Sequence, residues 1–248
     1  MADTDRQIIT VAGPAEMASA AADRIMARID GHGGRIAICL TGGSSPKQLY
    51  RLLASDAYRS RIPWHRVHWF IGDERFVPEG SPLNNMGEAR RIFLDQCAPA
   101  SSIHPVPTLT ANPDDSAERY ARELRSFYGA DEFSPDRPLF DLVLMGAGPD
   151  GHTASLFPGE PALDERERCV VGVASAPVEP FVPRVTLTLP ALGSCREMLF
   201  EVAGSGKRAI LTRLFNGENL PANHARSIGG ETVWLVDKAA LPEDRRGQ

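Results

Sequence analysis

Short apolar runs alternate along the chain with longer segments in which apolar residues recur every three or four positions. The run at residues 35–40 is continuously apolar after its first residue, which is typical of a strand buried on both faces. In residues 14–30 the apolar positions, among them Ala18, Ala22 and Ile25, fall on one side of a helix. Because strands and helices of these kinds keep alternating, we predict an α/β fold with a mostly parallel, doubly wound open sheet.

The same pattern sets the expected order of the elements. Ser45 and Pro46 predict a helix start, with Ser45 as the cap and Pro46 as the first helical residue. The strands between residues 169 and 204 have little helix between them, so we expect antiparallel pairing or a small subsidiary β region there. No linker or repeat divides the chain, which predicts a single α/β domain over residues 1–248. Further strands are expected at residues 6–12, 67–73, 140–145, 169–174, 184–189, 196–204 and 232–237, and further helices at 85–96, from Asn112-Pro113 onward and at 207–215.

The composition limits the class of protein. With 42% hydrophobic residues the chain can bury a sizeable core, and its formal net charge of -5 argues against nucleic acid as a partner. No signal peptide and no apolar run of membrane length is present, so we expect no membrane partner. Four scattered cysteines without CxxC spacing predict reduced thiols in a cytoplasmic protein.

The most informative segment is residues 140–159, FDLVLMGAGPDGHTASLFPG. A buried strand here runs into a turn where Asp150 and His152 stand among glycines that expose the backbone to a ligand. Ligands of open α/β sheets bind at the carboxyl ends of strands, and a histidine can exchange a proton near neutral pH. A histidine that only caps a helix at Thr153 is the alternative, and the flanking glycines favour an active site.

Two other predicted strands end in polar turns. Gly42, Gly43 and Ser44 precede a helix, and free N–H groups at such a turn can bind an anion; alternatively, the glycines only shape the turn. At the third exit, Asp73 and Arg75 could face the same crevice; alternatively, Arg75 forms a surface ion pair with Asp73 or Glu74.

Two further cations follow or begin apolar strands. Arg184 is either a strand-end surface charge or a phosphate ligand, and Lys207 is either a solvated lysine or a phosphate ligand.

Several motifs of other enzyme classes fail in their context. The GAGPDG at 146–151 matches GxGxxG, but Pro158 prevents the long helix that a dinucleotide site needs. The GSGK at 204–207 lacks the hydroxyl residue that would hold magnesium, because Arg208 follows. GxSxG, SxxK and HExxH are absent, and His65 and His68 have poor spacing for a metal. We therefore predict no metal and no cofactor, and a water molecule activated directly by a side chain.

The motifs together carry a family resemblance. TGGSSPKQLY, VHWFIGDERFVP, LNNMGEAR, FDLVLMGAGPDGHTASLFPG, PRVTLTLPAL and LPAN…TVWLVDKAA occur in one order between about Thr41 and Ala240. They resemble the 6-phosphogluconolactonases of the glucosamine-6-phosphate isomerase/6-phosphogluconolactonase family. The resemblance implies a sheet of the glucosamine-6-phosphate isomerase kind. It also implies metal-independent hydrolysis of 6-phospho-D-glucono-1,5-lactone in the pentose phosphate pathway, with no obligate protein partner evident.

The resemblance also implies catalytic roles. His152 would be the general base that takes a proton from the attacking water and then protonates the departing ring oxygen. Asp150 and Asp73 would orient the imidazole, the water or sugar hydroxyls, and which does which stays open. Arg75 would supply positive charge near the substrate.

A second set of residues is implied for the phosphate. The turn of Gly42, Gly43 and Ser44 would hold it together with Arg184 and Lys207. The family usually has serine before asparagine where this chain has Asn84-Asn85, which leaves Asn85 as the matching residue.

Two other functions compete with the lactonase. The deaminases of the same family carry a glutamate five positions after the histidine, where this chain has Phe157, and a tyrosine in place of Arg75. Sugar-phosphate sensors without catalysis usually join this fold to a DNA-binding segment, for which we expect no spare length in the chain. The proline-rich stretch from Pro177 to Pro183 is the one candidate for a lid.

Overall fold

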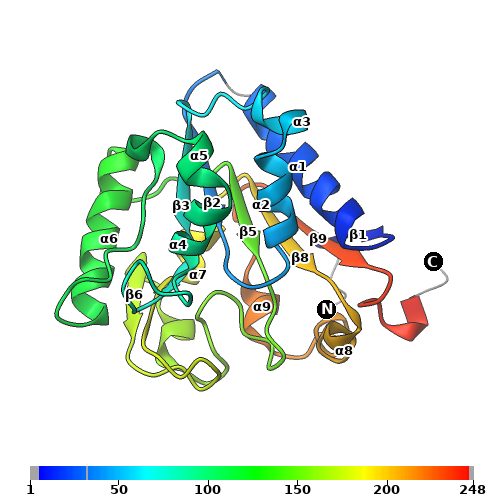
Figure 1. Ribbon diagram of the computed structural model, residues 1–248. Coiled ribbons are helices and arrows are strands. Elements are labelled where there is room, and N and C mark those ends of the chain that lie inside the picture. The colour runs from blue at the N-terminus through cyan, green and yellow to red at the C-terminus, as the bar shows by residue number, and fades with distance from the viewer. Residues whose placement is uncertain (1–5, 32, 246–248) are drawn as a thin grey trace.

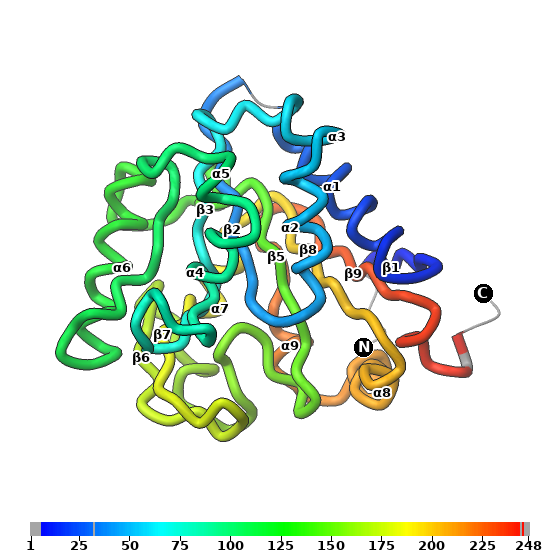
Figure 2. Tube along the Cα trace, viewed as in Figure 1, coloured from blue at the N-terminus to red at the C-terminus, as the bar shows by residue number. Residues whose placement is uncertain are grey.

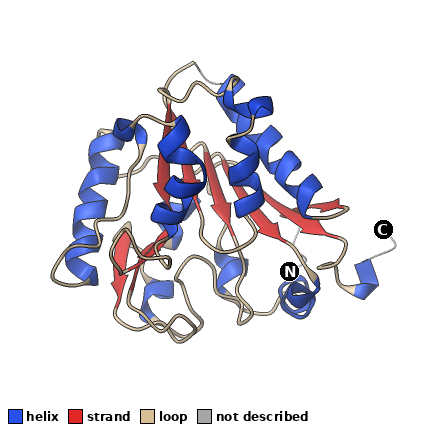
Figure 3. Cartoon of the chain, in the orientation of Figure 1, coloured by secondary structure: helices blue, strands red, loops and turns tan. Residues whose placement is uncertain are grey.

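The computed structural model describes residues 6–31 and 33–245 and has two sheets (Figures 1 and 3). The main sheet has six strands in the order β1-β9-β8-β5-β2-β3, and every neighbouring pair in it is parallel. Its strands are β1 (Arg6–Val11), β2 (Ile36–Leu40), β3 (Val67–Ile71), β5 (Leu142–Met145), β8 (Glu197–Val202) and β9 (Glu231–Asp237). The predicted parallel sheet is therefore confirmed.

The small second sheet is the subsidiary β region expected near residues 169–204. Its order is β4-β7-β6, with antiparallel pairing throughout. The strands are β4 (Asp73–Arg75), β6 (Val170–Val173) and β7 (Arg184–Leu187). The prediction of one strand over 67–73 is wrong at its end, because Gly72 leaves the main sheet. Its N–H still donates to Leu40 O (3.0 Å), whereas its carbonyl accepts from Leu187 N (2.9 Å) in the small sheet.

Helices connect the strands and surround the main sheet (Figures 1 and 2). The α-helices are α1 (Pro14–Asp30), α2 (Lys47–Leu53), α3 (Asp56–Arg59), α4 (Asn85–Ala89), α5 (Asp95–Cys97), α6 (Pro113–Tyr128), α7 (Leu189–Gly193), α8 (Arg208–Phe215) and α9 (Pro221–His224). A π-helical segment, η1 (Arg90–Leu94), separates α4 from α5, so the helix predicted at 85–96 is not regular. The 3₁₀ segments are η2 (Ala100–Ser102), η3 (Pro161–Asp164), η4 (Ser205–Lys207) and η5 (Glu243–Arg245).

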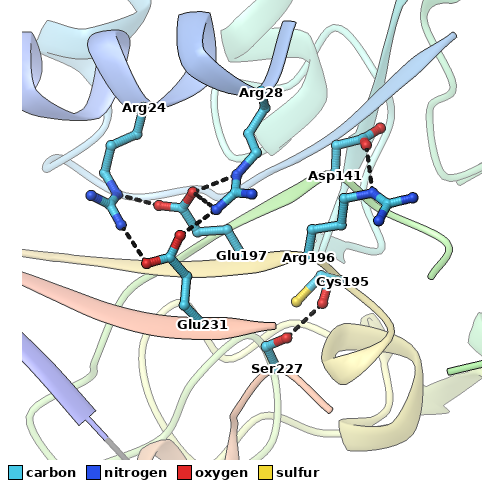
Figure 4. A network of polar contacts seen from close by, with 8 residues as sticks. All are labelled: Arg24, Arg28, Asp141, Cys195, Arg196, Glu197, Ser227 and Glu231. Atoms are coloured by element: carbon cyan, nitrogen blue, oxygen red, sulfur yellow. Dashed lines mark hydrogen bonds and ion pairs between the residues drawn. The ribbon is translucent and has the colours of Figure 1, made fainter. Parts of the chain in front are cut away.

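Both faces of the main sheet are covered, which the alternation of side chains along β8 makes visible. Glu197 points to the face where Arg24 and Arg28 of α1 bind it (Figure 4). Phe200, an odd number of residues along, points to the other face. There it stacks on Trp234 with ring centres 3.9 Å apart, and Phe215 of α8 packs against Trp234. The sheet is thus doubly wound, as predicted.

The start of α2 differs from the sequence prediction. Its first helical residue is Lys47, Pro46 occupies the cap position and no side chain caps the helix, so Ser45 is not the cap. The chain first turns at Gly43, whose φ of 95° lies in the left-handed region that glycine tolerates. The helix therefore begins at Lys47, after this turn.

The strand order places a crevice beside β5. From β2 the chain adds β3 on one side, whereas from β5 it adds β8 and β9 on the other. The carboxyl ends of β2 and β5 therefore lie at the switch point where open α/β sheets bind ligands. No helix in the described part of the chain is long and apolar enough to cross a membrane.

Candidate active site

A cavity of about 250 Å³ opens at this switch point. Turns that follow β2, β5 and β8 line it, together with β4, β7 and the start of α4. All of the predicted site residues except Asp150 line it: Gly42, Gly43, Ser44, Asp73, Arg75, Asn85, His152, Arg184 and Lys207. The strand exits that were separate motifs in the sequence therefore meet at one site.

His152 is held by the residue two positions before it. Its Nδ1 lies 2.5 Å from Asp150 Oδ1, and its backbone N–H donates to the same oxygen at 3.1 Å. With Nδ1–H donated to a carboxylate, the free ring nitrogen, Nε2, is the basic one. Asp150 thus fixes both the orientation and the tautomer of an imidazole that lines the cavity.

The backbone around His152 is shaped for this imidazole. A Cβ added to Gly148 would lie 2.1 Å from the His152 Nδ1 atom, so only glycine lets the ring lie against the backbone here. Gly151 has a φ of 88°, and Gly148 N donates to His152 O at 2.8 Å, which closes the turn. Residues 150–157 contain no helix, so His152 is not a helix cap.

The residue five positions after His152 packs under its ring. Phe157 is buried, and its ring centre is 4.8 Å from that of His152. An apolar aromatic side chain here excludes a carboxylate from this side of the imidazole. The presence of Phe157 in place of the glutamate expected for a deaminase therefore leaves no carboxylate at this position beside His152.

Asp73 lies in a different environment from Asp150. Ser155 Oγ donates to Asp73 Oδ2 at 2.6 Å, and both residues are buried. Asn85 Nδ2 donates to the backbone oxygen of Asp73 at 3.0 Å. Thr186 Oγ1 in turn accepts from Ser155 N at 3.2 Å. Of the two predicted carboxylates, Asp150 contacts the imidazole and Asp73 is held by the hydroxyl group of Ser155.

The turn after β2 presents unused backbone donors. In the described structure the N–H groups of Gly42, Gly43 and Ser44 donate to no protein acceptor. Gly42 packs directly on Asn85, since a Cβ there would lie 2.2 Å from Asn85 Oδ1. Adjacent free N–H groups make a concave anion-binding site. Asn84, one residue before, instead caps α4 by accepting from Gly87 N at 2.7 Å.

Three cations line the same cavity. Arg75 Nη1 donates to Leu83 O (2.9 Å), and its Nε is buried with no hydrogen-bond partner in the described structure. Arg184 is 4% exposed; burial lowers its pKa, and Asp73 opposes this effect. Lys207 Nζ donates to Ala147 O (2.6 Å); burial lowers its pKa, and Asp150 opposes this effect. Three positive charges at neutral pH suit a ligand of high negative charge.

The alternative of a surface ion pair between Glu74 and Arg75 does not hold in the structure. The Glu74 side chain is fully buried and accepts hydrogen bonds from the backbone N–H groups of Arg75, Asn85 and Met86 at 2.9, 2.6 and 2.8 Å. Burial raises the pKa of Glu74 to about 7, although these N–H groups act to lower it. Glu74 therefore ties β4 to the start of α4 and so positions Asn85.

Sequence reasoning missed three polar residues of this region, Glu74, Ser155 and Glu201. Glu201 lines the cavity from β8 and carried the clearest signal, a single acid inside the apolar run LFEVA. No local pattern marks Ser155, because its partner Asp73 is 82 positions away in the sequence. Within the described residues, no three His, Cys, Asp or Glu side chains are grouped so as to hold a metal ion.

Comparison with known proteins shows which family this sequence matches. The family model described as "Glucosamine-6-phosphate isomerases/6-phosphogluconolactonase" matches residues 12–234. A 6-phosphogluconolactonase of Synechocystis sp. is 41% identical over 84% of this chain and 84% of its own length.

Solved structures agree with the sequence match. The 6-phosphogluconolactonase from Trypanosoma cruzi superimposes with a TM-score of 0.84 at 28% identity, covering 97% of each chain. A monomeric glucosamine-6-phosphate deaminase superimposes with a TM-score of 0.78 at 17% identity, covering 94% of this chain and 98% of its own. The last likeness shows the shared fold alone.

Proposed function

Because the chain belongs to the glucosamine-6-phosphate isomerase/6-phosphogluconolactonase family, we propose that it hydrolyses 6-phospho-D-glucono-1,5-lactone to 6-phospho-D-gluconate in the pentose phosphate pathway. The observation that carries this proposal is the Asp150–His152 pair at the wall of a cavity lined by three cations. A lactone is an activated ester, so one positioned base and stabilisation of the developing oxyanion suffice for its hydrolysis.

We propose His152 as the general base. Its Nδ1–H donates to Asp150, and its Nε2 takes a proton from a water molecule as the water oxygen bonds to the lactone carbonyl carbon. The carbonyl oxygen becomes an oxyanion, and the Arg75 guanidinium, whose Nε has no hydrogen-bond partner in the described structure, supplies positive charge near it. When the oxyanion reforms the carbonyl, the bond to the ring oxygen breaks. The imidazolium of His152 then returns its proton to that oxygen, which becomes a hydroxyl group.

We propose that another part of the cavity binds the phosphate. The N–H groups of Gly42, Gly43 and Ser44 supply neutral donors, and Lys207 keeps donor hydrogens beyond the one given to Ala147. Arg184 adds a buried guanidinium, and the side chain of Asn85 packs against Gly42 of the turn. Asp73, held by Ser155, is directed to a sugar hydroxyl or the attacking water, because His152 already has its carboxylate partner.

The cysteines and the net charge bear on the compartment and on the partners of the enzyme. All four cysteines are free thiols, and three of them are buried, so we propose that the enzyme works in the reducing cytoplasm. The acidic net charge suits neither nucleic acid nor an anionic membrane surface. We therefore propose the sugar-phosphate lactone as the partner of this cavity, with neither cofactor nor protein partner required.

Replacing His152 with alanine tests the function and the base together. We expect kcat to fall by roughly 10²–10⁴-fold, because general base catalysis supplies acceleration of that size. Binding of 6-phosphogluconate should persist, since the phosphate residues are unchanged. The assay follows 6-phosphogluconate through a coupled dehydrogenase, with the lactone generated in place and the spontaneous hydrolysis subtracted.

His224 offers a matched control. It is an exposed histidine on α9 that contacts Asn219, so His224→Ala should keep the wild-type rate. Near-normal turnover in His152→Ala would discard the base and keep the function. No acceleration by the wild-type protein would discard the lactonase, and glucosamine-6-phosphate would then be the substrate to assay. Ligand binding without turnover of either compound would indicate a sugar-phosphate sensor.

A further inference from the structure

Among the residues that the structure describes, Glu201 is the one buried acid at the cavity that the proposed reaction does not use. Glu201 lies near the end of β8, opposite Leu235 of β9, and its side chain is 2% exposed. Neither of its oxygens has a hydrogen-bond partner within the described part of the chain. The residue nevertheless lines the cavity, together with the Gly42–Ser44 turn and Lys207. A buried carboxyl group with no protein partner, at the wall of a ligand site, points to a partner that arrives with the ligand.

The neighbours of Glu201 are already engaged elsewhere. The pKa of Tyr50 of α2 is raised by burial and, to a smaller extent, by the charge of Glu201. The Tyr50 hydroxyl donates to Thr41 O (2.7 Å) and accepts from Thr41 N (3.1 Å). Lys207 donates to Ala147 O, and Asp237 of β9 accepts from Gly204 N and Ala240 N. The other titratable or charged groups around the cavity and Tyr50 are Cys39, Asp73, Arg75, Glu88, Asp150, His152, Glu179 and Arg184. None of them gives Glu201 a hydrogen bond or an ion pair in the described structure.

The isolation of Glu201 determines its protonation. Burial without a compensating charge raises the pKa of Glu201 from 4.5 to about 8. At neutral pH the group is therefore mostly a neutral acid, with one O–H donor that has no acceptor in the protein. A carboxylic acid held neutral in this way can donate a hydrogen bond to an anion, whereas its ionised form repels one.

We propose that Glu201 is a proton-linked specificity residue for the phosphate group: protonated, it donates a hydrogen bond to the phosphate directly or through one water, and ionised, it repels the phosphate. This inference rests on the proposed function, since it takes the anion at the Gly42–Ser44 turn to be the substrate phosphate. In this arrangement the turn supplies N–H donors, Lys207 supplies positive charge and Glu201 of β8 supplies an O–H donor to the phosphate.

Two measurable consequences follow from linkage. A bound phosphate dianion stabilises the protonated form of Glu201, so binding takes up a proton at a pH near or above the pKa of the free enzyme. The affinity for a phosphorylated ligand also falls above pH 8, by at most roughly tenfold for each pH unit. Lys207 could produce a change of the same sign, because its pKa is lowered by burial, and a variant must separate the two groups.

The experiment is calorimetric binding of 6-phosphogluconate, the unreactive product, between about pH 7 and pH 9.5 in two buffers of different ionisation enthalpy. For the wild type we expect a Kd that rises roughly tenfold or more over this range and uptake of up to one proton near about pH 8.5. Glu201→Gln keeps an N–H donor but cannot ionise, so its Kd should be flat and its proton uptake lost. Glu201→Leu lacks the donor and should bind roughly tenfold more weakly at pH 7 with no slope.

Glu197→Gln is the matched control, because Glu197 lies on the same strand with the same 2% exposure but outside the cavity. It should keep the slope and the proton uptake of the wild type.

The outcomes separate the inference from the function. The inference is wrong if the wild type takes up no proton on binding, a result that does not depend on any variant folding. It is also wrong if Glu201→Gln, shown to be folded by circular dichroism, retains the wild-type slope, since Lys207 would then be its source. Failure of the wild type both to bind 6-phosphogluconate and to hydrolyse the lactone at pH 7 would overturn the proposed function, and this inference with it.

Discussion

Strand β8 carries two buried glutamates that differ only in their partners. Glu197 and Glu201 are four residues apart, so both point to the same face of the sheet, and each is 2% exposed. Glu197, at the amino end, binds Arg24 and Arg28 of α1 (Figure 4). Glu201, at the carboxyl end, has no partner within the described residues. The buried charge at one end of the strand is paired, and the buried carboxyl group at the other end has no partner in the described structure.

The same contrast extends along the two edges of the main sheet. At the amino edge, Asp141 accepts from Arg196 Nε (3.2 Å) and from the backbone N–H of Ala37 (2.8 Å) (Figure 4). At the carboxyl edge, the N–H groups of Gly42 and Gly43 have no acceptor among the described residues. Gly42 is partly exposed and Gly43 is exposed, so their N–H groups are open to water and to an anion that replaces the water.

The largest effect that separates the two glutamates is the pH dependence of stability. In the unfolded chain Glu201 ionises near its ordinary pKa of 4.5, but in the folded protein it ionises near 8. Between these values the folded state binds more protons than the unfolded state, so the free energy of unfolding falls as pH rises and levels off above about pH 8. Glu201→Gln lacks this titration. Its stability relative to the wild type should therefore rise from pH 5 to pH 8, by on the order of a few kcal/mol.

Urea unfolding of both proteins at several pH values measures this difference. The buried amide of the variant adds a constant offset to its free energy of unfolding. The ionisation of Glu201 is therefore measured by how the stability difference between the two proteins changes with pH. Glu74, whose pKa is also raised, titrates in both proteins and cancels in the comparison. Parallel stability curves would mean that Glu201 is ionised in the folded protein, and the contrast with Glu197 would fail.

The next effect tests how tightly the carboxyl edge is built around His152. Gly148→Ala places a methyl group where the imidazole lies, since the Cβ would be 2.1 Å from His152 Nδ1. Displacement of a catalytic group by about 1 Å can cost roughly 10²-fold, so we expect kcat to fall by about that factor while the fold persists. The coupled lactone assay and a thermal melt measure the two quantities.

Gly206→Ala is the control for Gly148→Ala. Gly206 follows β8 at the same edge, and a Cβ there would meet nothing within 4 Å. Turnover should be close to that of the wild type. If Gly148→Ala were equally active, the imidazole would have another way to lie in the cavity, and its position would not depend on this glycine.

Much of the fold follows from the apolar pattern because the main strands are buried on both faces. The run at 35–40 became β2, and the turns after β2, β5 and β8 meet because parallel strands end at one edge. The break at Gly72 could not be predicted, since it depends on a partner strand, β7, supplied much later in the chain. The prediction that Ser45 caps the helix was wrong, because the chain turns at Gly43 and the helix begins only at Lys47.

The candidate site was predictable to the extent that its residues follow strands. His152, Asp73 and Lys207 each stand at a strand end, so topology alone brings them to one cavity. The division of labour between Asp150 and Asp73 was not predictable, because it depends on Ser155 reaching Asp73 across the fold. Glu201 was missed for a related reason: a sequence shows that an acid is buried but not whether a base faces it.

The smallest effect is at the amino edge, where the comparison predicts loss of stability without loss of function. Glu197→Gln removes the charge bound by Arg24 and Arg28, but both arginines remain partly exposed and keep Glu231 as a partner. We therefore expect a loss of about 1–2 kcal/mol in the free energy of unfolding, less than for a pair that is buried on both sides. Glu231→Gln, at a side chain 44% exposed, should cost roughly 0.5 kcal/mol or less. Both variants should hydrolyse the lactone at the wild-type rate at 25 °C, because the cavity lies at the other end of the strand. A change in kcat for Glu197→Gln without a change in stability would show that the two ends of β8 are not independent.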